Sequence, residues 1–242
     1  MITVGLPVFN QTRIMHIALE GLCRQEDTGD WELIISSEDN SVWKVVDVYT
    51  ERLKNAGCID VVCDRIKGWI PLPQKWKKIG SMMNESSIGM ILQAADCYSH
   101  PARINQSKDA MQKEYNWYHE SMGYFYYLNK GLLVKYDNSR HKVGTVTHLN
   151  MCISGDYAKK LPSCELKSGI DAWMFRTIPA PELKVKQIDK LHSGVDLHGM
   201  NNISKKRGRM IEDCRNAFKN PRTSLDKIGL PDDVVTMINR LK

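Results

Sequence analysis

The chain has 242 residues, of which 42% are hydrophobic and 26% are charged. This length fits one compact domain, or one domain with a small appendage, and the charged fraction excludes a wholly disordered chain. The 34 Lys and Arg exceed the 28 Asp and Glu, which gives a net charge of +6 that permits an anionic partner without requiring one. No apolar run approaches the roughly 18–20 residues that span a bilayer, so we expect no membrane partner.

The first part of the chain alternates between apolar strands and amphipathic helices. Continuous apolar runs predict strands, and apolar side chains at helical spacing predict helices between them. The strands are expected over residues 2–6, 31–36 and 59–62, and the helices over residues 12–25 and 42–56. This alternation predicts a parallel sheet covered by helices on both faces, whose ligands bind beyond the carboxyl ends of the strands.

The pattern of short elements continues to about residue 200, where the sequence becomes polar and basic. The expected elements are a helix over 74–87, a strand over 88–92, a helix over 102–119, a hairpin over 124–136, a strand over 143–153, helices over 155–161 and 170–178, a strand over 184–189 and two short helices over 209–218 and 231–242. We therefore predict one α/β domain over residues 1–200, with a basic loop and helical tail over residues 201–242.

The cysteines indicate a reducing compartment. They stand at positions 23, 58, 63, 97, 152, 164 and 214, and no two of them form a CxxC pair. Because the N-terminus also lacks a basic flank and a small-residue cleavage site, we expect no signal peptide and a cytoplasmic protein with reduced thiols. The same spacing argues against a structural zinc site.

Two polar loops follow the first two predicted strands. One contains Pro7, Phe9 and Asn10, and the other contains Glu38 and Asp39. The aromatic ring could lie against a nucleobase, and a carboxylate could accept a hydrogen bond from a base N–H or a ribose hydroxyl. The alternative is that Phe9 belongs to the core and that Glu38 and Asp39 form a solvated turn. The sequence has no GxGxxG and no GxxxxGK[ST], so neither a Rossmann dinucleotide site nor a P-loop is supported.

The segments around these loops, ITVGLPVFNQ and WELIISSEDNS, resemble the opening of family-2 glycosyltransferases of the GT-A fold. Those enzymes begin with an apolar strand that ends in Pro-Val-Tyr-Asn-Glu, then a helix, then a strand that ends in Asp-Asp-Gly-Ser. Phe9 stands for the Tyr, Gln11 for the Glu, and residues 38–41 for the second motif. The resemblance covers residues 2 to about 195. It implies a Rossmann-like, mostly parallel sheet and an inverting transfer of a sugar from a nucleotide-sugar donor to a hydroxyl acceptor.

The resemblance also implies where the donor binds. Pro7, Phe9, Asn10 and Glu38 are expected to hold the nucleoside. Lys77 and Lys78 fall near an Arg-Asn pair of the family, and Lys78 is expected at the diphosphate together with Asp96 and a divalent ion.

The expected metal loop departs from the family pattern. Gln93-Ala94-Ala95-Asp96 falls where the family has Asp-x-Asp-Asp, so Asp96 alone keeps a carboxylate for Mn²⁺ or Mg²⁺. The alternative is that Asp96 only caps a turn. Family members often complete the metal site with a His near the C-terminal end, for which His192 and His198 are both candidates. His198 is favoured because the polar residues after it could form a loop that closes over a donor.

Asp171 is the candidate general base. The resemblance places it where the family has an Asp that deprotonates the acceptor hydroxyl, a role that requires a carboxylate within hydrogen-bond reach. The alternative is a helix N-cap, a position that Asp favours. Glu165 is the reserve candidate for the base.

The acceptor is expected to be soluble: a glycan, a protein or a hydroxylated DNA base in a bacterial virus. The basic run over residues 205–209 and the aromatic side chains between 117 and 127 would suit a flipped base. Two other functions stay open. An inactive GT-A-like module that binds a nucleotide or nucleic acid would explain Gln93 and Ala95. A nucleotidyltransferase would need a glycine-rich basic loop after the first strand, which the sequence lacks.

Overall fold

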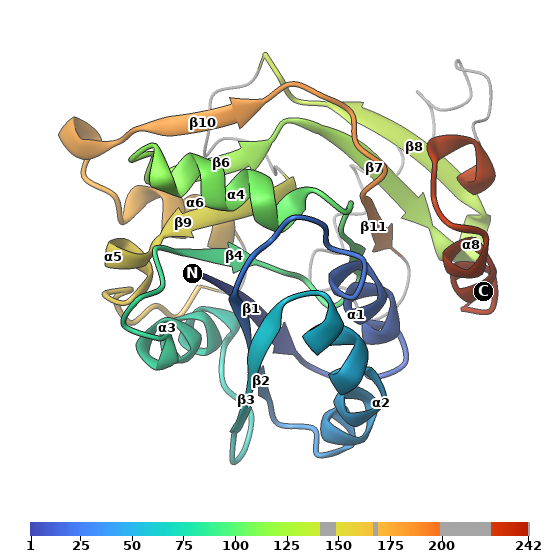
Figure 1. Ribbon diagram of the computed structural model, residues 1–242, viewed down its shortest axis with the longest axis horizontal. Coiled ribbons are helices and arrows are strands. Elements are labelled where there is room, and N and C mark those ends of the chain that lie inside the picture. The colour runs from blue at the N-terminus through green and yellow to red at the C-terminus, as the bar shows by residue number, and fades with distance from the viewer. Residues whose placement is uncertain (141–148, 167–168, 199–223, 242) are drawn as a thin grey trace.

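The computed structural model describes residues 1–140, 149–166, 169–198 and 224–241. Among these residues, seven strands form the main sheet in the order β10-β6-β9-β4-β1-β2-β3 (Figure 1). Their bounds are β1 Ile2–Val8, β2 Trp31–Ser37, β3 Cys58–Arg65, β4 Gly89–Leu92, β6 Trp117–Glu120, β9 Leu149–Ser154 and β10 Val185–Ile188. Only β9 runs antiparallel to its neighbours in this described sheet, which confirms the predicted mostly parallel α/β architecture.

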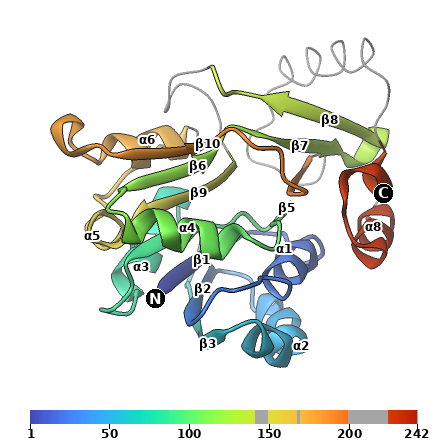
Figure 2. The ribbon, with the colours of Figure 1, turned by 45° about the horizontal axis from the view of Figure 1, so that its top comes forward.

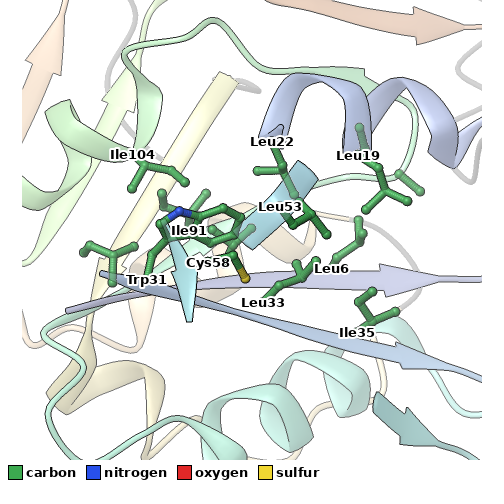
Figure 3. Packing of buried hydrophobic residues seen from close by; sticks show 14 of the residues in the cluster. Leu6, Leu19, Leu22, Trp31, Leu33, Ile35, Leu53, Cys58, Ile91 and Ile104 are labelled. Atoms are coloured by element: carbon green, nitrogen blue, oxygen red, sulfur yellow. The ribbon is translucent and has the colours of Figure 1, made fainter. Parts of the chain in front are cut away.

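Helices cover both faces of the main sheet. One face carries α1 (Met15–Leu22), α2 (Ser41–Asn55) and α4 (Arg103–Gln112), and the other carries α3 (Leu72–Met82), α5 (Gly155–Ala158) and α6 (Ile170–Arg176). In β2, Leu33 and Ile35 pack in the first core while Ile34 packs in the second. Figure 3 shows the first core, where Leu19 and Leu53 meet the strand side chains. Because both faces are buried, the strands read as continuous apolar runs.

A second sheet carries the remaining described strands. Its order is β5-β11-β7-β8, with bounds β5 Cys97–Tyr98, β7 Met122–Tyr127, β8 Leu132–Asp137 and β11 Val195–His198. The predicted hairpin is confirmed as β7 and β8, which are joined by the 3₁₀ turn η1 (Leu128–Lys130) and by Gly131 at φ 58°. The strand β11 lies between β5 and β7, and its pairing with β5 joins segments far apart in the sequence.

The C-terminal part packs against α1 and the second sheet (Figure 2). It contains the 3₁₀ turn η3 (Leu225–Ile228) and α8 (Asp232–Asn239), and Arg24, two residues after the end of α1, donates a hydrogen bond to Asp233. A third 3₁₀ turn, η2 (Ala180–Glu182), precedes β10. No helix in the described part of the chain is long and apolar enough to cross a membrane.

The structure corrects some predicted boundaries. The helix expected over 102–119 ends at Gln112, and β6 begins at Trp117, because Trp117 and Tyr118 pack into the two opposite cores. Glu114, at φ 60°, breaks the helix before them. The helix expected over 74–87 ends at Met82. The helix expected over 209–218, the basic run over 205–209 and the start of the strand expected over 143–153 lie outside the described residues.

Candidate active site

The carboxyl ends of β1 and β2 meet at a buried lysine. Lys75 of α3 donates from Nζ to the Val8 carbonyl oxygen at 2.9 Å and also to the Glu38 carboxylate, and its ammonium lies 5.3 Å from the centre of the Phe9 ring. Only 3% of the Lys75 side chain and 12% of the Glu38 side chain are exposed. The pKa of Lys75 lies below its usual value, because burial lowers it more than the neighbouring Glu38 carboxylate raises it. This ion pair fixes the loop that was expected to hold the nucleoside.

Close packing of α3 on β1 brings Lys75 to this position. A Cβ atom on Gly5 would lie 2.7 Å from the Trp76 ring, so glycine at this point of β1 lets the helix approach. Lys78 of the same helix, which the resemblance implied at the diphosphate, donates from Nζ to Asp64 of β3 at 2.8 Å and stays 43% exposed. Lys77 is exposed and donates to Ser163 Oγ at 2.8 Å. Lys75, not Lys78, is therefore the lysine beside Glu38 and Phe9.

The other residues of the two loops that were considered for binding the nucleotide-sugar donor differ in exposure and contacts. Phe9 is 37% exposed, so the alternative of a core residue does not hold. Asn10 is exposed and adopts a left-handed conformation with φ 49°. Pro7 is a buried member of β1 that pairs with Ser36 of β2. The solvated-turn alternative fits Asp39, because its carboxylate accepts from Ser41 N at 2.8 Å and Ser41 Oγ at 2.6 Å at the start of α2.

A group of acidic residues lies beyond β4. Asp96 is 8% exposed, and Gln11 Nε2 lies 3.5 Å from its Oδ2. The ligand atoms of Asp96, Cys97 and Asp196 all lie within 4.8 Å of one another, because Cys97 of β5 pairs with Asp196 of β11. His198 Nε2 lies 3.3 Å from Asp196 Oδ2. The second sheet thus brings a carboxylate and an imidazole to Asp96.

The electrostatics of this acidic group match a cation site. Burial, and next the charge of Asp196, raise the pKa of Asp96 to about 7. The same two causes raise the pKa of Asp171 to about 6. Buried carboxylates that repel one another are stabilised by a divalent cation, and carboxylate oxygens with an imidazole are a suitable donor set for Mn²⁺. The residues present therefore fit the metal that the resemblance implied.

Gln93 has a structural role. Its Oε1 accepts from Ser99 Oγ at 2.7 Å and from the Arg103 guanidinium, and its Nε2 donates to the Cys97 carbonyl oxygen at 2.8 Å. It is fully buried, and Ala95 is 1% exposed. These bonds shape the loop that presents Asp96. The second carboxylate of the group comes from Asp196, which only the long-range pairing of β5 with β11 reveals.

The candidate base lies at the start of α6. The N-cap residue is Gly169 at φ 68°, and Asp171 occupies the first turn behind it, so the N-cap alternative does not describe Asp171. The charge of Asp196 acts on Asp171, which places the two carboxylates in one electrostatic group. Glu165 is exposed and accepts from Gln74 Nε2 at 3.0 Å.

The two candidate metal histidines lie in different groups. The His198 ring packs edge-on against Phe125, with ring centres 4.7 Å apart, and lies 5.3 Å from the Tyr127 ring. His192 instead stacks on His100, with ring centres 4.1 Å apart. The structure therefore brings His198 to the Asp96 group and separates His192 from it.

Comparison with solved structures identifies the fold. Residues 1–349 of TarS from S. aureus in complex with UDP align at a TM-score of 0.61, with 10% identity over 99% of this chain and 70% of that chain. The mannosyltransferase PcManGT from Pyrobaculum calidifontis, in complex with GDP-Man and Mn²⁺, aligns at 0.55, with 9% identity over 99% of this chain and 69% of that chain. Glucosyl-3-phosphoglycerate synthase from Mycobacterium tuberculosis, in complex with Mn²⁺, UDP and glucosyl-3-phosphoglycerate, aligns at 0.53, with 13% identity over 96% of this chain and 81% of that chain.

These alignments show that the chain has the GT-A glycosyltransferase fold. The longer TarS structure aligns over 98% of this chain, which spans 42% of the length of that protein. No protein-family model matches the sequence, and no curated protein matches it significantly.

Proposed function

We propose that the protein is a glycosyltransferase that moves a sugar from a nucleoside-diphosphate sugar to a hydroxyl acceptor, with Mn²⁺ or Mg²⁺ as cofactor. The observation that carries this proposal is the convergence of Asp96, Asp196 and His198 beyond β4. The charge of Asp196 also acts on Asp171. The solved neighbours of this fold hold UDP or GDP-Man, some of them with Mn²⁺. Two carboxylates of this group, Asp96 and Asp171, have pKa values raised by burial and next by the charge of Asp196, a pattern that is concentrated at functional sites.

The nucleoside is proposed to bind at the ends of β1 and β2. Phe9 offers an exposed ring there, already fixed on one side by the Lys75 ammonium. Glu38 is ionically paired but keeps some exposure, which suits a hydrogen-bond acceptor for a base or ribose. The contacts of Lys75 with the Val8 carbonyl and Glu38 support a nucleoside site that would be formed before the donor arrives.

The diphosphate is proposed to bind next to Asp96, Asp196 and His198, which would hold the divalent ion. When bound, that ion offsets the negative charge that develops on the departing nucleoside diphosphate. Within this group, Gln11 faces Asp96, while Phe125 and Tyr127 hold the His198 ring. These contacts limit the movement of the ligands before a metal binds.

Asp171 is proposed to accept the proton of the acceptor hydroxyl. The acceptor oxygen then forms a bond to the anomeric carbon, while the bond from that carbon to the donor's phosphate oxygen breaks and the nucleoside diphosphate leaves. A single displacement of this kind inverts the anomeric configuration. A pKa of about 6 suits this role, because the group is ionised near neutral pH and still basic enough to take a proton. The acceptor is proposed to be a soluble glycan, protein or hydroxylated DNA base.

The experiment is an assay for nucleoside diphosphate release and sugar transfer. The purified protein is incubated with UDP-, GDP-, CDP- and dTDP-sugars, with and without Mn²⁺. Metal-dependent turnover that is lost in Asp96→Asn and retained in Asp156→Asn, an exposed carboxylate of α5, supports the proposal. Metal-dependent nucleotide binding without turnover for any donor, with hydroxyl acceptors present, would instead favour the inactive binding module.

A further inference from the structure

A second group of metal-ligand side chains lies apart from the Asp96 group. His100 follows β5, Glu120 ends β6 and His192 precedes β11, and their ligand atoms all lie within 4.8 Å of one another. His100 Nε2 lies 2.6 Å from Glu120 Oε1. Three segments that are distant in the sequence therefore place two imidazoles and one carboxylate together.

The carboxylate of this group is buried and held in place. Glu120 is 1% exposed and His100 is 2% exposed. Asn150 Nδ2 donates to Glu120 Oε2 at 2.7 Å, and the Tyr118 hydroxyl donates to Oε1 at 3.1 Å. Outer hydrogen bonds of this kind fix the orientation of metal-binding carboxylates.

The imidazole of His192 has an incomplete set of hydrogen bonds. Its Nε2 is buried and has no hydrogen-bond partner among the described residues. The ring lies nearly parallel to His100, at an angle of 14° and with ring centres 4.1 Å apart. A buried ring nitrogen without a hydrogen-bond partner is costly. Neutral imidazole is the form that binds metal ions.

We propose that His100, Glu120 and His192 form a Zn²⁺ site that is distinct from the Asp96 group. Two imidazoles and one carboxylate are a known zinc donor set, which leaves a fourth position for water. The Asp96 group, with its two carboxylates, favours the harder Mn²⁺ or Mg²⁺. Because an imidazole coordinates in the plane of its ring, one ring of the stacked pair turns when zinc binds. The cysteine spacing has no bearing on this site, since no cysteine contributes to it.

The position of this site suggests a structural use for the zinc ion. His100 lies four residues after Asp96, and His192 lies four residues before Asp196, so the two groups flank the β5–β11 pairing. Zinc would join the end of β6 to the segment that leads into β11. That strand carries Asp196 and His198, so the ion would stabilise the strand that completes the Asp96 group. The proposal does not depend on sugar transfer.

The test is a zinc titration of chelator-treated protein by calorimetry, followed by Co²⁺ substitution and its visible absorption. We expect one Zn²⁺ to bind per chain in the presence of saturating Mn²⁺, with a higher melting temperature as a result. His192→Ala should weaken zinc binding at least tenfold, whereas His198→Ala and Asp96→Asn should change it less than threefold. His192 is only partly buried, so its alanine variant should fold, which circular dichroism would check.

Three results would overturn the proposal. The first is zinc binding that survives in His192→Ala but disappears in Asp96→Asn, which would assign the ion to the Asp96 group. The second is no zinc binding to the folded wild-type protein. In Glu120→Gln, which keeps the shape of the side chain, zinc binding should also fall at least tenfold. Unchanged binding in that variant is the third result, because it would exclude the carboxylate as a ligand.

Discussion

Replacement of Lys75 by methionine removes the ammonium that lies between Val8, Glu38 and the Phe9 ring, and keeps a side chain of similar length. In the wild type, the Lys75 and Glu38 side chains are 3% and 12% exposed. Without the lysine, the Glu38 carboxylate keeps the hydrogen bond that it accepts from the backbone N–H of Ile70 at 3.3 Å. Lys75→Met therefore leaves a largely buried negative charge on Glu38 without its counter-charge.

The expected cost follows from that burial. Removing one partner of a buried ion pair costs about 3–5 kcal/mol. Glu38 keeps some contact with water and one weak hydrogen bond, so we expect a loss near the lower end, about 3 kcal/mol. For a chain of this size, each kcal/mol changes the melting temperature by about 2–4 °C, which gives a decrease of about 6–12 °C. Adding Glu38→Gln removes the stranded charge, so the double variant should recover at least about 1 kcal/mol.

The assay is urea and thermal unfolding of the wild type, Lys75→Met, Glu38→Gln and the double variant. Lys77→Met is the matched control, because Lys77 lies on the same helix with an exposed side chain, and its loss should cost less than about 0.5 kcal/mol. A loss of less than about 1 kcal/mol in Lys75→Met, or a double variant no more stable than Lys75→Met, would refute the reasoning about this pair.

Three further outcomes are expected. Asp171→Asn should lower the transfer rate by about 10²–10⁴-fold and leave the nucleotide affinity unchanged, as measured by initial rates and calorimetry; equal loss in Asp156→Asn would contradict the assignment. Since burial and Asp196 raise the pKa of Asp171 to about 6, kcat/KM should rise with pH through that value and then level off. For Asp96, whose folded pKa of about 7 exceeds its unfolded value, the metal-free protein should lose stability as pH rises toward 7. Asp96→Asn should therefore raise the melting temperature at pH 8 without metal and abolish any increase caused by Mn²⁺; a lower melting temperature would contradict this sign.

Local patterns in the sequence predicted much of the fold. The strands near residues 2–6 and 31–36 are buried on both faces, so their apolar runs are continuous and easy to identify. Residues 117–119 fall at the end of the polar stretch over 102–119 that predicts a helix. Their strand conformation depends on Trp117 and Tyr118 packing into two opposite cores, which no local window contains.

The same difference between local patterns and long-range contacts decides which residues of the candidate site could be predicted. Phe9, Glu38 and Asp96 could be found because each follows a recognisable strand. Lys75 could not, since a buried lysine is expected only once its carboxylate partner is known. Asp196 has no predicted role, although it lies in the sequence between the candidates His192 and His198. Its approach to Asp96 depends on the long-range pairing of β5 with β11.

The most direct test of the central claim is calorimetric titration of nucleoside diphosphates into wild-type protein and Asp196→Asn, with and without Mn²⁺. In the proposed mechanism, Asp96, Asp196 and His198 together hold a divalent ion at a nucleotide-sugar site. We predict Mn²⁺-dependent binding of at least one nucleoside diphosphate to the wild type, and affinity at least tenfold weaker in Asp196→Asn. Equal affinity in both proteins, or the same affinity with and without Mn²⁺, would contradict the claim.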